Sequence, residues 1–208
     1  MSTVNPLPLS TLAPFAAQPA AGAPARTEIA FVLNNVADWQ ALAAGVRPGV
    51  QVVVLDGTGD GLAQKTPGSV DAIHLLGHGS SGSLNLGALT LNTDNLQEQA
   101  ATLAQIGGAL TAQGDWLLYG CNVAEGAAGV SLLGQLAQFS GADVAASSDA
   151  TGATALGGDW VLEAASGDIN ASLLTAQAWR HSLAIASFSP ADNSTNVAAG
   201  LTPLVVTM

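Results

Sequence analysis

Two residues of this sequence, His78 and Cys121, have the types and surroundings that nucleophilic catalysis needs. His78 lies in the glycine-rich stretch GHGSSG, and Cys121 lies in YGCN, directly after an apolar run. A cysteine nucleophile needs a thiolate, a nearby imidazole base and N–H donors for the oxyanion that develops on its substrate. The backbone N–H groups of Gly79 and of Cys121 could be these donors, because glycine lets a substrate approach the backbone. Taken singly, each residue has a structural alternative: Cys121 as a small buried apolar side chain, and His78 as a turn residue.

Both residues follow apolar segments that the sequence predicts to be consecutive β-strands. Apolar runs bounded by turn residues predict buried strands at Glu28–Val36, Gln51–Leu55, Ala72–Leu76, Trp116–Tyr119 and Asp143–Ala146. Their alternation with helical segments is typical of a mostly parallel sheet that is covered on both faces. The sequence therefore predicts an α/β fold, a three-layer α/β/α domain. Because sites in such sheets form beyond the carboxyl ends of the strands, we expect His78 and Cys121 side by side at that edge, in direct or water-bridged contact.

The connecting segments complete the expected pattern. Periodic apolar residues predict helices at Ala37–Ala44, at Gly61–Lys65, from a cap at Asn92 or Thr93 to Leu110, at Ser131–Phe139 and at Ala171–Leu183. The alternating stretch Leu84–Leu91, with Gly87 at its centre, predicts a hairpin, and Asp159–Glu163 predicts a further strand.

The composition excludes several other classes of function. Fifteen acidic residues against four Lys and Arg give the 208-residue chain a formal net charge of -11. Clustered basic side chains are needed to bind nucleic acid or an anionic membrane surface, so neither partner is expected. One cysteine and three histidines argue against a disulfide framework, a zinc site and a His-rich metal centre. No apolar run reaches the roughly 18 residues of a membrane-spanning helix, and we expect no metal and no cofactor.

Two glycine-rich motifs are weak signals of ligand binding. GHGSSG fits the G-x-G-x-x-G spacing of dinucleotide sites, but a hairpin pattern follows it where that fingerprint requires a helix. DGTGDG resembles the start of a calcium loop, but Pro67 stands where an EF-hand needs glutamate. A small-ligand or calcium-binding module is therefore a third, weaker alternative.

Three segments of the chain resemble DUF4347, a bacterial domain family of unknown function found near the N-termini of very large surface and adhesin-like proteins. They are AIHLLGHGSSGSLNLG, GDWLLYGCNVAEGAAG and GADVAASSDATGATALGGDWVLE, and the resemblance extends from Glu28 to about Ile169. The family itself looks like the caspase-like cysteine peptidases of the gingipain and clostripain type. Those enzymes have a His-Gly dipeptide after one strand and a Cys after the next. The resemblance implies that His78 is the general base and Cys121 the nucleophile.

The resemblance also implies a function, a caspase-like cysteine endopeptidase domain within a large exported bacterial surface protein. Its substrate would be a polypeptide, for which its own parent chain is one candidate. The alternative from another class is a non-catalytic, degenerate module that serves adhesion, retention or folding of a giant adhesin. Asp149 follows the fifth strand and is expected at the mouth of a substrate pocket, where it would favour Arg or Lys. A solvated or turn-capping acid is the alternative for this residue.

The two ends of the chain differ in composition from its centre. Residues 1–27 are rich in Pro and Ala and predict a disordered leader without the basic and apolar regions of a classical signal peptide. Residues 28–185 form the predicted α/β domain. Residues 186–208 contain SPADNSTNV, which resembles the first strand of a bacterial immunoglobulin-like repeat, and are too short to complete such a domain. We therefore expect a piece of a multidomain protein that is secreted or at the cell surface, without a classical N-terminal signal peptide.

Overall fold

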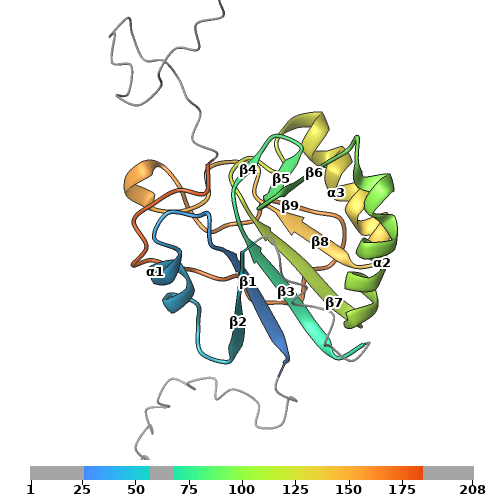
Figure 1. Cartoon of the computed structure of the whole chain (residues 1–208), viewed down its shortest axis with the longest axis horizontal. Coiled ribbons are helices and arrows are strands. Elements are labelled where there is room, and N and C mark those ends of the chain that lie inside the picture. The colour runs from blue at the N-terminus through green and yellow to red at the C-terminus, as the bar shows by residue number, and fades with distance from the viewer. Residues whose placement is uncertain (1–25, 57–67, 185–208) are drawn as a thin grey trace, which may run out of the picture.

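The centre of the fold is a six-stranded sheet with the strand order β2-β1-β3-β7-β8-β9 (Figure 1). A computed structural model describes residues 26–56 and 68–184 of the chain. The strands of this sheet are β1 (Glu28–Leu33), β2 (Val50–Leu55), β3 (Val70–Leu76), β7 (Leu110–Tyr119), β8 (Asp143–Ala146) and β9 (Ala164–Ala165). All pair in parallel except β9, which is antiparallel to β8. The predicted α/β class with a mostly parallel sheet is confirmed.

The helices and a small second sheet lie in the connections between these strands. The helices are α1 (Trp39–Ala44), the 3-10 turn η1 (Leu96–Gln99), α2 (Ala100–Ala109), α3 (Gly126–Ser140) and the 3-10 turn η2 (Thr154–Leu156). The second sheet comprises β4 (Gly79–Ser80), β5 (Ser83–Leu86) and β6 (Leu89–Asn92). β5 and β6 form the predicted hairpin, while the short strand β4, which begins directly after His78, was not predicted from the sequence.

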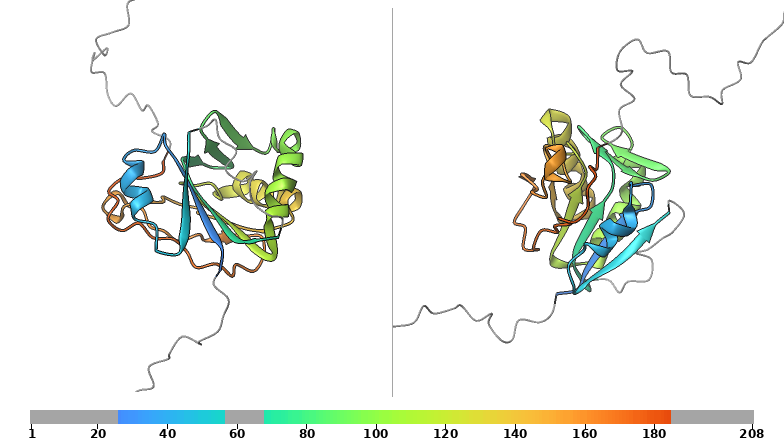
Figure 2. Two further views of the ribbon diagram at one scale, coloured as in Figure 1. Left: turned by 60° about the horizontal axis from the view of Figure 1, so that its bottom comes forward. Right: turned by 90° about the vertical axis from the view of Figure 1, so that its left-hand side faces the viewer.

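The central strands are apolar along their whole length because both faces of the sheet are covered. Every residue of β1 is buried, and so is every residue of β3 except Asp71. Helices α2 and α3 pack against each other, and Gly107 of α2 makes the approach possible, because a Cβ there would overlap the backbone of Ser140. The other face is covered by α1 and by the segment that follows β9, whose Trp179 indole donates to the carbonyl of Ala37 (3.0 Å). Figure 2 shows this segment, in orange, running beside α1.

Two of the elements predicted for the C-terminal part are wrong. Asp159–Glu163 is not a strand, and the last strand of the sheet is limited to Ala164–Ala165. Ala171–Leu183 is not a helix, because its backbone follows an irregular, partly extended course.

The irregular course of this segment follows from contacts with the sheet. Two of its N–H groups donate to sheet side chains instead of helix carbonyls: Ala171 to the Asp115 carboxylate (2.6 Å) and Leu174 to the Tyr119 hydroxyl (2.8 Å). The side chains of Leu174 and Trp179 are buried as well. These tertiary contacts outweigh the modest helix propensity of the segment.

Three predicted segments lie wholly or largely outside the described residues. They are the helix at Gly61–Lys65, the tail 186–208, and the leader 1–27 apart from its last two residues. Within that leader, Thr27 accepts a backbone hydrogen bond from Asp71 (2.7 Å), so the described chain joins the sheet just before β1. In the described ranges, no helix is both long enough and apolar enough to cross a membrane.

Candidate active site

The structure places the backbones of His78 and Cys121 side by side at the carboxyl edge of the sheet. β3 and β7 are neighbours, and their last paired residues are Leu76 and Tyr119. His78 and Cys121 each lie two residues further along, and the Gly77 N–H still donates to the Tyr119 carbonyl (3.1 Å). Both loops therefore leave the sheet together, as parallel strand ends require.

Glycines let these two loops touch through their backbones. A Cβ on Gly79 would overlap the side chain of Val123 and would lie 2.9 Å from the carbonyl oxygen of Cys121. A Cβ on Gly120 would lie 3.1 Å from the Gly77 carbonyl oxygen and 3.2 Å from the Gly79 nitrogen. Larger residues at these positions would push the histidine loop away from the cysteine loop.

The imidazole of His78 is oriented by a backbone carbonyl from the end of β1. Its Nε2 lies 3.4 Å from the carbonyl oxygen of Asn35, at the limit of a hydrogen bond. A carbonyl can only accept, so this contact favours the tautomer with the proton on Nε2 and leaves Nδ1 as the basic nitrogen. Nδ1 is buried and has no hydrogen-bond partner among the described residues. Sequence reasoning missed Asn35, because a backbone carbonyl leaves no signature in residue type.

The thiol of Cys121 is buried and points toward the loop after β8. Only 2% of the residue is exposed. Its Sγ accepts a hydrogen bond from the Thr151 N–H (3.1 Å) and lies 3.2 Å from the Ser182 hydroxyl. Among the described residues the thiol and the imidazole of His78 do not hydrogen-bond to each other, since each is held by its own partners.

Backbone hydrogen bonds hold the loop that carries Cys121 against the loop after β8. The Asn122 N–H donates to the Asp149 carbonyl (2.7 Å), and the Ala124 N–H donates to the Ser147 carbonyl (2.8 Å). Asn122 has a φ of 60°, a left-handed conformation that asparagine tolerates better than most residues. This local turn brings Thr151 under the thiol.

The two predicted oxyanion donors belong to these touching loops. The Gly79 N–H donates to the carbonyl oxygen of Leu183 (3.1 Å), so a peptide carbonyl already occupies the first of these donors. The N–H of Cys121, the second predicted donor, lies in the adjoining loop. Sequence reasoning did not anticipate that Leu183, predicted to be helical, reaches this site.

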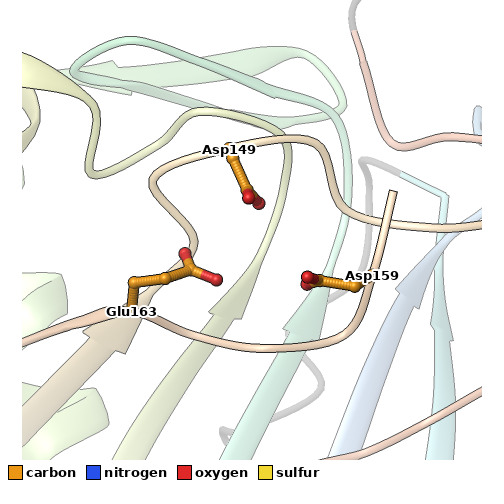
Figure 3. A group of neighbouring side chains, drawn as sticks. All are labelled: Asp149, Asp159 and Glu163. Carbon is orange, nitrogen blue, oxygen red and sulfur yellow. The ribbon is translucent and has the colours of Figure 1, made fainter. Parts of the chain in front are cut away.

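Asp149, predicted at a substrate pocket, lies in an exposed group of three acidic side chains with Asp159 and Glu163 (Figure 3). One oxygen from each of the three lies within 4.8 Å of the others. Partial burial and the charges of Glu163 and Asp159 raise the pKa of the Asp149 carboxyl, against the opposing hydrogen bond from Ser147. Asp159, and not Asp149, lines a neighbouring cavity of about 590 Å³. The role of Asp149 in substrate binding stays a prediction.

Comparison with known proteins identifies a family for this chain. No curated protein and no solved structure matches the chain. Residues 29–183 match the model of a family described as a domain of unknown function, DUF4347. This range contains both residues of the candidate site and every strand of the sheet, apart from Glu28 at the start of β1. The chain therefore belongs to the DUF4347 family.

Proposed function

We propose that this DUF4347 domain is a caspase-like cysteine endopeptidase, with Cys121 as the nucleophile and His78 as the general base. The observation that carries the proposal is that the two residues follow the ends of adjoining strands, where the N–H of the neighbouring Gly79 binds a peptide carbonyl. The Asn35 carbonyl supports the role of His78, since it leaves Nδ1 available to take a proton.

Each group near the thiol has a part in this chemistry. Hydrogen bonds from the Thr151 N–H and the Ser182 hydroxyl can stabilise Sγ as a thiolate. The N–H of Gly79, with that of Cys121, can stabilise the negative charge on the carbonyl oxygen of the attacked peptide. His78 would take the thiol proton and return it to the leaving amine, and water would hydrolyse the thioester.

The proposal is tested by labelling the purified chain with an electrophilic peptide probe, such as a peptidyl acyloxymethyl ketone. Since Cys121 is the single cysteine of the chain, intact mass identifies its adduct directly. We expect one adduct in the wild type, none in Cys121→Ala, and labelling slowed by on the order of a hundredfold in His78→Ala.

A chemical control separates catalysis from simple access to the thiol. In urea, the wild type and His78→Ala should react with iodoacetamide at the same rate, because unfolding removes the effect of the site. Circular dichroism checks that both variants fold. Equal probe labelling of the folded wild type and folded His78→Ala would refute the proposed dyad.

A non-catalytic module is the second candidate, and one observation favours it. The thiol is almost fully buried, and residues 181–184 cover it. A domain that serves only adhesion, retention or folding of a larger protein would keep this packing and show no His78-dependent labelling. The same probe experiment therefore decides between the two functions.

The proposal also includes the cellular location of the domain and the class of its substrate. Its acidity and its family resemblance fit a large exported bacterial surface protein with adhesin-like parts, and a polypeptide as substrate. Antibody staining of intact producing cells, with and without added protease, measures whether the domain is exposed at the cell surface. Protection of the domain from external protease in intact cells would contradict a surface location.

A further inference from the structure

Residues 181–184 form a short extended strand beside the candidate site, and its pairing consists of isolated β-bridges. The Ala153 N–H donates to the His181 carbonyl (2.9 Å), and the Leu183 N–H donates to the Thr151 carbonyl (3.0 Å). Gly152 forms an antiparallel bridge with Ser182. Strand addition of this kind is one of the ways in which proteins bind extended peptides.

The far side of the same strand contacts the histidine loop. Leu183 accepts a hydrogen bond from the Gly79 N–H (3.1 Å), and Gly79 forms a parallel bridge with Ala184. The segment therefore lies between the loop after β8 and the loop after β3, with the thiol beside it.

Two contacts relate the strand to the groups of the candidate site. The Leu183 carbonyl accepts a hydrogen bond from Gly79, the predicted oxyanion donor, and the side-chain hydroxyl of the preceding residue, Ser182, lies 3.2 Å from the thiol. The Leu183 side chain is fully buried, as the side chain before a scissile bond is when it fills a pocket, while Ala184 is exposed. The peptide bond between Leu183 and Ala184 is therefore the one whose carbonyl the predicted oxyanion donor holds.

We propose that residues 181–184 are an intramolecular substrate and that Cys121 cleaves the peptide bond between Leu183 and Ala184. This inference rests on the proposed peptidase function and adds to it the bond and the substrate class. The site takes an extended segment with a leucine-like apolar residue before the cut. Asp149 would favour Arg or Lys before the cut, whereas the residue before this cut is Leu183.

The chemical steps balance with water as the only co-reactant. Sγ of the Cys121 thiolate forms a bond to the carbonyl carbon of Leu183, and the oxygen takes the negative charge beside the Gly79 N–H. Collapse of this intermediate breaks the C–N bond, and the Ala184 nitrogen leaves as an amine with the proton that His78 took from the thiol. Water then adds to the thioester, the S–C bond breaks, and Leu183 is left with a carboxylate while the thiol is restored.

The end of the family match lies at the same point of the chain. The DUF4347 match ends at residue 183. A cut after Leu183 would leave the matched domain whole and keep the Leu183 side chain in the core. It would release only the part of the chain that lies beyond this domain.

The test follows the integrity of the full chain by intact mass and N-terminal sequencing. We expect the wild-type chain to convert to fragments 1–183 and 184–208. In Cys121→Ala the rate of cleavage should be at least a hundredfold lower, so that the chain remains whole over the same time. Ala184→Pro should also block the cut, because proline makes the scissile amide tertiary and constrains it. Ala184→Gly keeps the secondary amide and is the matched control that should still be cut.

Dilution tests the intramolecular assignment. The half-life of the uncut wild-type chain should be unchanged over a hundredfold range of concentration. A half-life that lengthens with dilution, or a cut at any other bond, would overturn the inference.

The probe experiment keeps this inference separate from the proposed function. His78-dependent labelling of Cys121 in a chain that stays whole would leave the peptidase standing and refute cleavage at Leu183. Ala153→Pro removes the N–H that donates to the His181 carbonyl. This variant should have a more loosely bound strand at 181–184, and it provides a more open site for the same labelling assay. If this variant and the wild type are both uncut and both unlabelled, the peptidase proposal fails together with the inference.

Discussion

At the scale of single residues, the candidate site depends on backbone groups as much as on side chains. The carbonyl of Asn35 selects the basic nitrogen of His78, and the N–H of Thr151 holds the thiol of Cys121. The loops after β3 and β7 also lie very close to each other, which glycine at 79 and 120 makes possible. The residues that make the site possible are therefore partly ones with no reactive group.

Gly79→Ala should damage both the fold and the site. Its Cβ would overlap Val123, and relief of the overlap would part the two loops. We expect the free energy of unfolding to fall by about 1–3 kcal/mol, the usual effect of overpacking, together with loss of probe labelling at Cys121. Urea denaturation followed by tryptophan fluorescence measures the first effect.

Gly134→Ala is the matched control for that variant. Gly134 lies inside α3, and a Cβ there meets nothing within 4 Å. It should stabilise the protein by about 0.5–1 kcal/mol through higher helix propensity. If Gly79→Ala is as stable as this control, the close contact of the loops is not essential.

The buried pair of His74 and Glu28 should make the protein sensitive to mild acid. His74 is fully buried, and its Nε2 lies 2.9 Å from the Glu28 carboxylate. Burial lowers the pKa of His74 despite this hydrogen bond. As pH falls, the imidazole of His74 is therefore protonated in the unfolded chain before it is protonated in the folded protein. The stability that neutral His74 contributes is complete above the ordinary histidine pKa of about 6.5 and is lost as pH falls below it.

The measurement is the free energy of unfolding by urea between pH 7.5 and pH 5. Wild type should lose stability through this range, and His74→Gln, which cannot titrate, should lose less. At lower pH the wild type should lose further stability through Glu28, whose pKa is also lowered: burial raises it, but hydrogen bonds from His74 and Arg47 outweigh burial. Parallel curves from pH 7.5 to pH 5 would show that His74 is not the sensitive group.

At the scale of elements, the decisive piece is the strand formed by residues 181–184. It is short, and backbone hydrogen bonds to Thr151, Ala153 and Gly79 hold it in place. Because this strand contacts the buried thiol through Ser182, we expect Cys121 to become reachable from outside when the strand opens.

Ala153→Pro should raise the rate at which external probes reach Cys121. Ala153 has a φ of -67°, which suits proline, so the change removes the N–H donor to His181 without straining its own backbone. Loss of a hydrogen bond worth about 1 kcal/mol should raise the open population, and with it the labelling rate, roughly fivefold. Self-cleavage after Leu183 should slow in the same variant, because the strand is less firmly seated.

Ala153→Ser keeps the N–H and is the matched control. Intact mass against time measures labelling and self-cleavage together in both variants. If proline and serine give equal labelling rates, the strand does not control access to the thiol.

At the scale of the whole molecule, one face of the sheet is covered in large part by a segment that is not helical, beside the short helix α1. Asp115, which is fully buried, accepts hydrogen bonds from the N–H groups of Asn170 and Ala171. Arg47 adds a contact to the carbonyl of Ser172 (3.1 Å). Asp115 of the sheet and Arg47 of the loop before β2 thus hold the course of this layer, which ends at the candidate site.

Asp115→Ala should loosen this whole layer. It leaves two N–H groups without their acceptor, at a cost of about 1–3 kcal/mol for each one that stays buried. Urea denaturation gives the loss of stability, and amide hydrogen exchange should show faster exchange across 170–184. Asp168→Ala, an exposed acid in the same segment, is the control, and equal exchange in the two variants would refute the anchoring role.

The sequence alone was enough to predict the parallel sheet and the place of the candidate residues in it. Its strands are short apolar runs, and each reactive residue directly follows one of them, so local patterns carry the information. The rule that parallel strands end at one edge then puts the loops of His78 and Cys121 together. The helix α3 and the hairpin of β5 and β6 were predictable for the same local reason.

Only the tertiary structure decided what lies around the two residues. The Asn35 carbonyl, the Thr151 N–H and the strand at 181–184 act through backbone groups, which every residue possesses and which no sequence pattern distinguishes. The segment Ala171–Leu183 has a helical pattern, yet hydrogen bonds to Asp115 and Tyr119 hold it in an irregular course. Contacts between distant parts of the chain outweigh local propensity there, and the same segment goes on to place Ser182 beside the thiol.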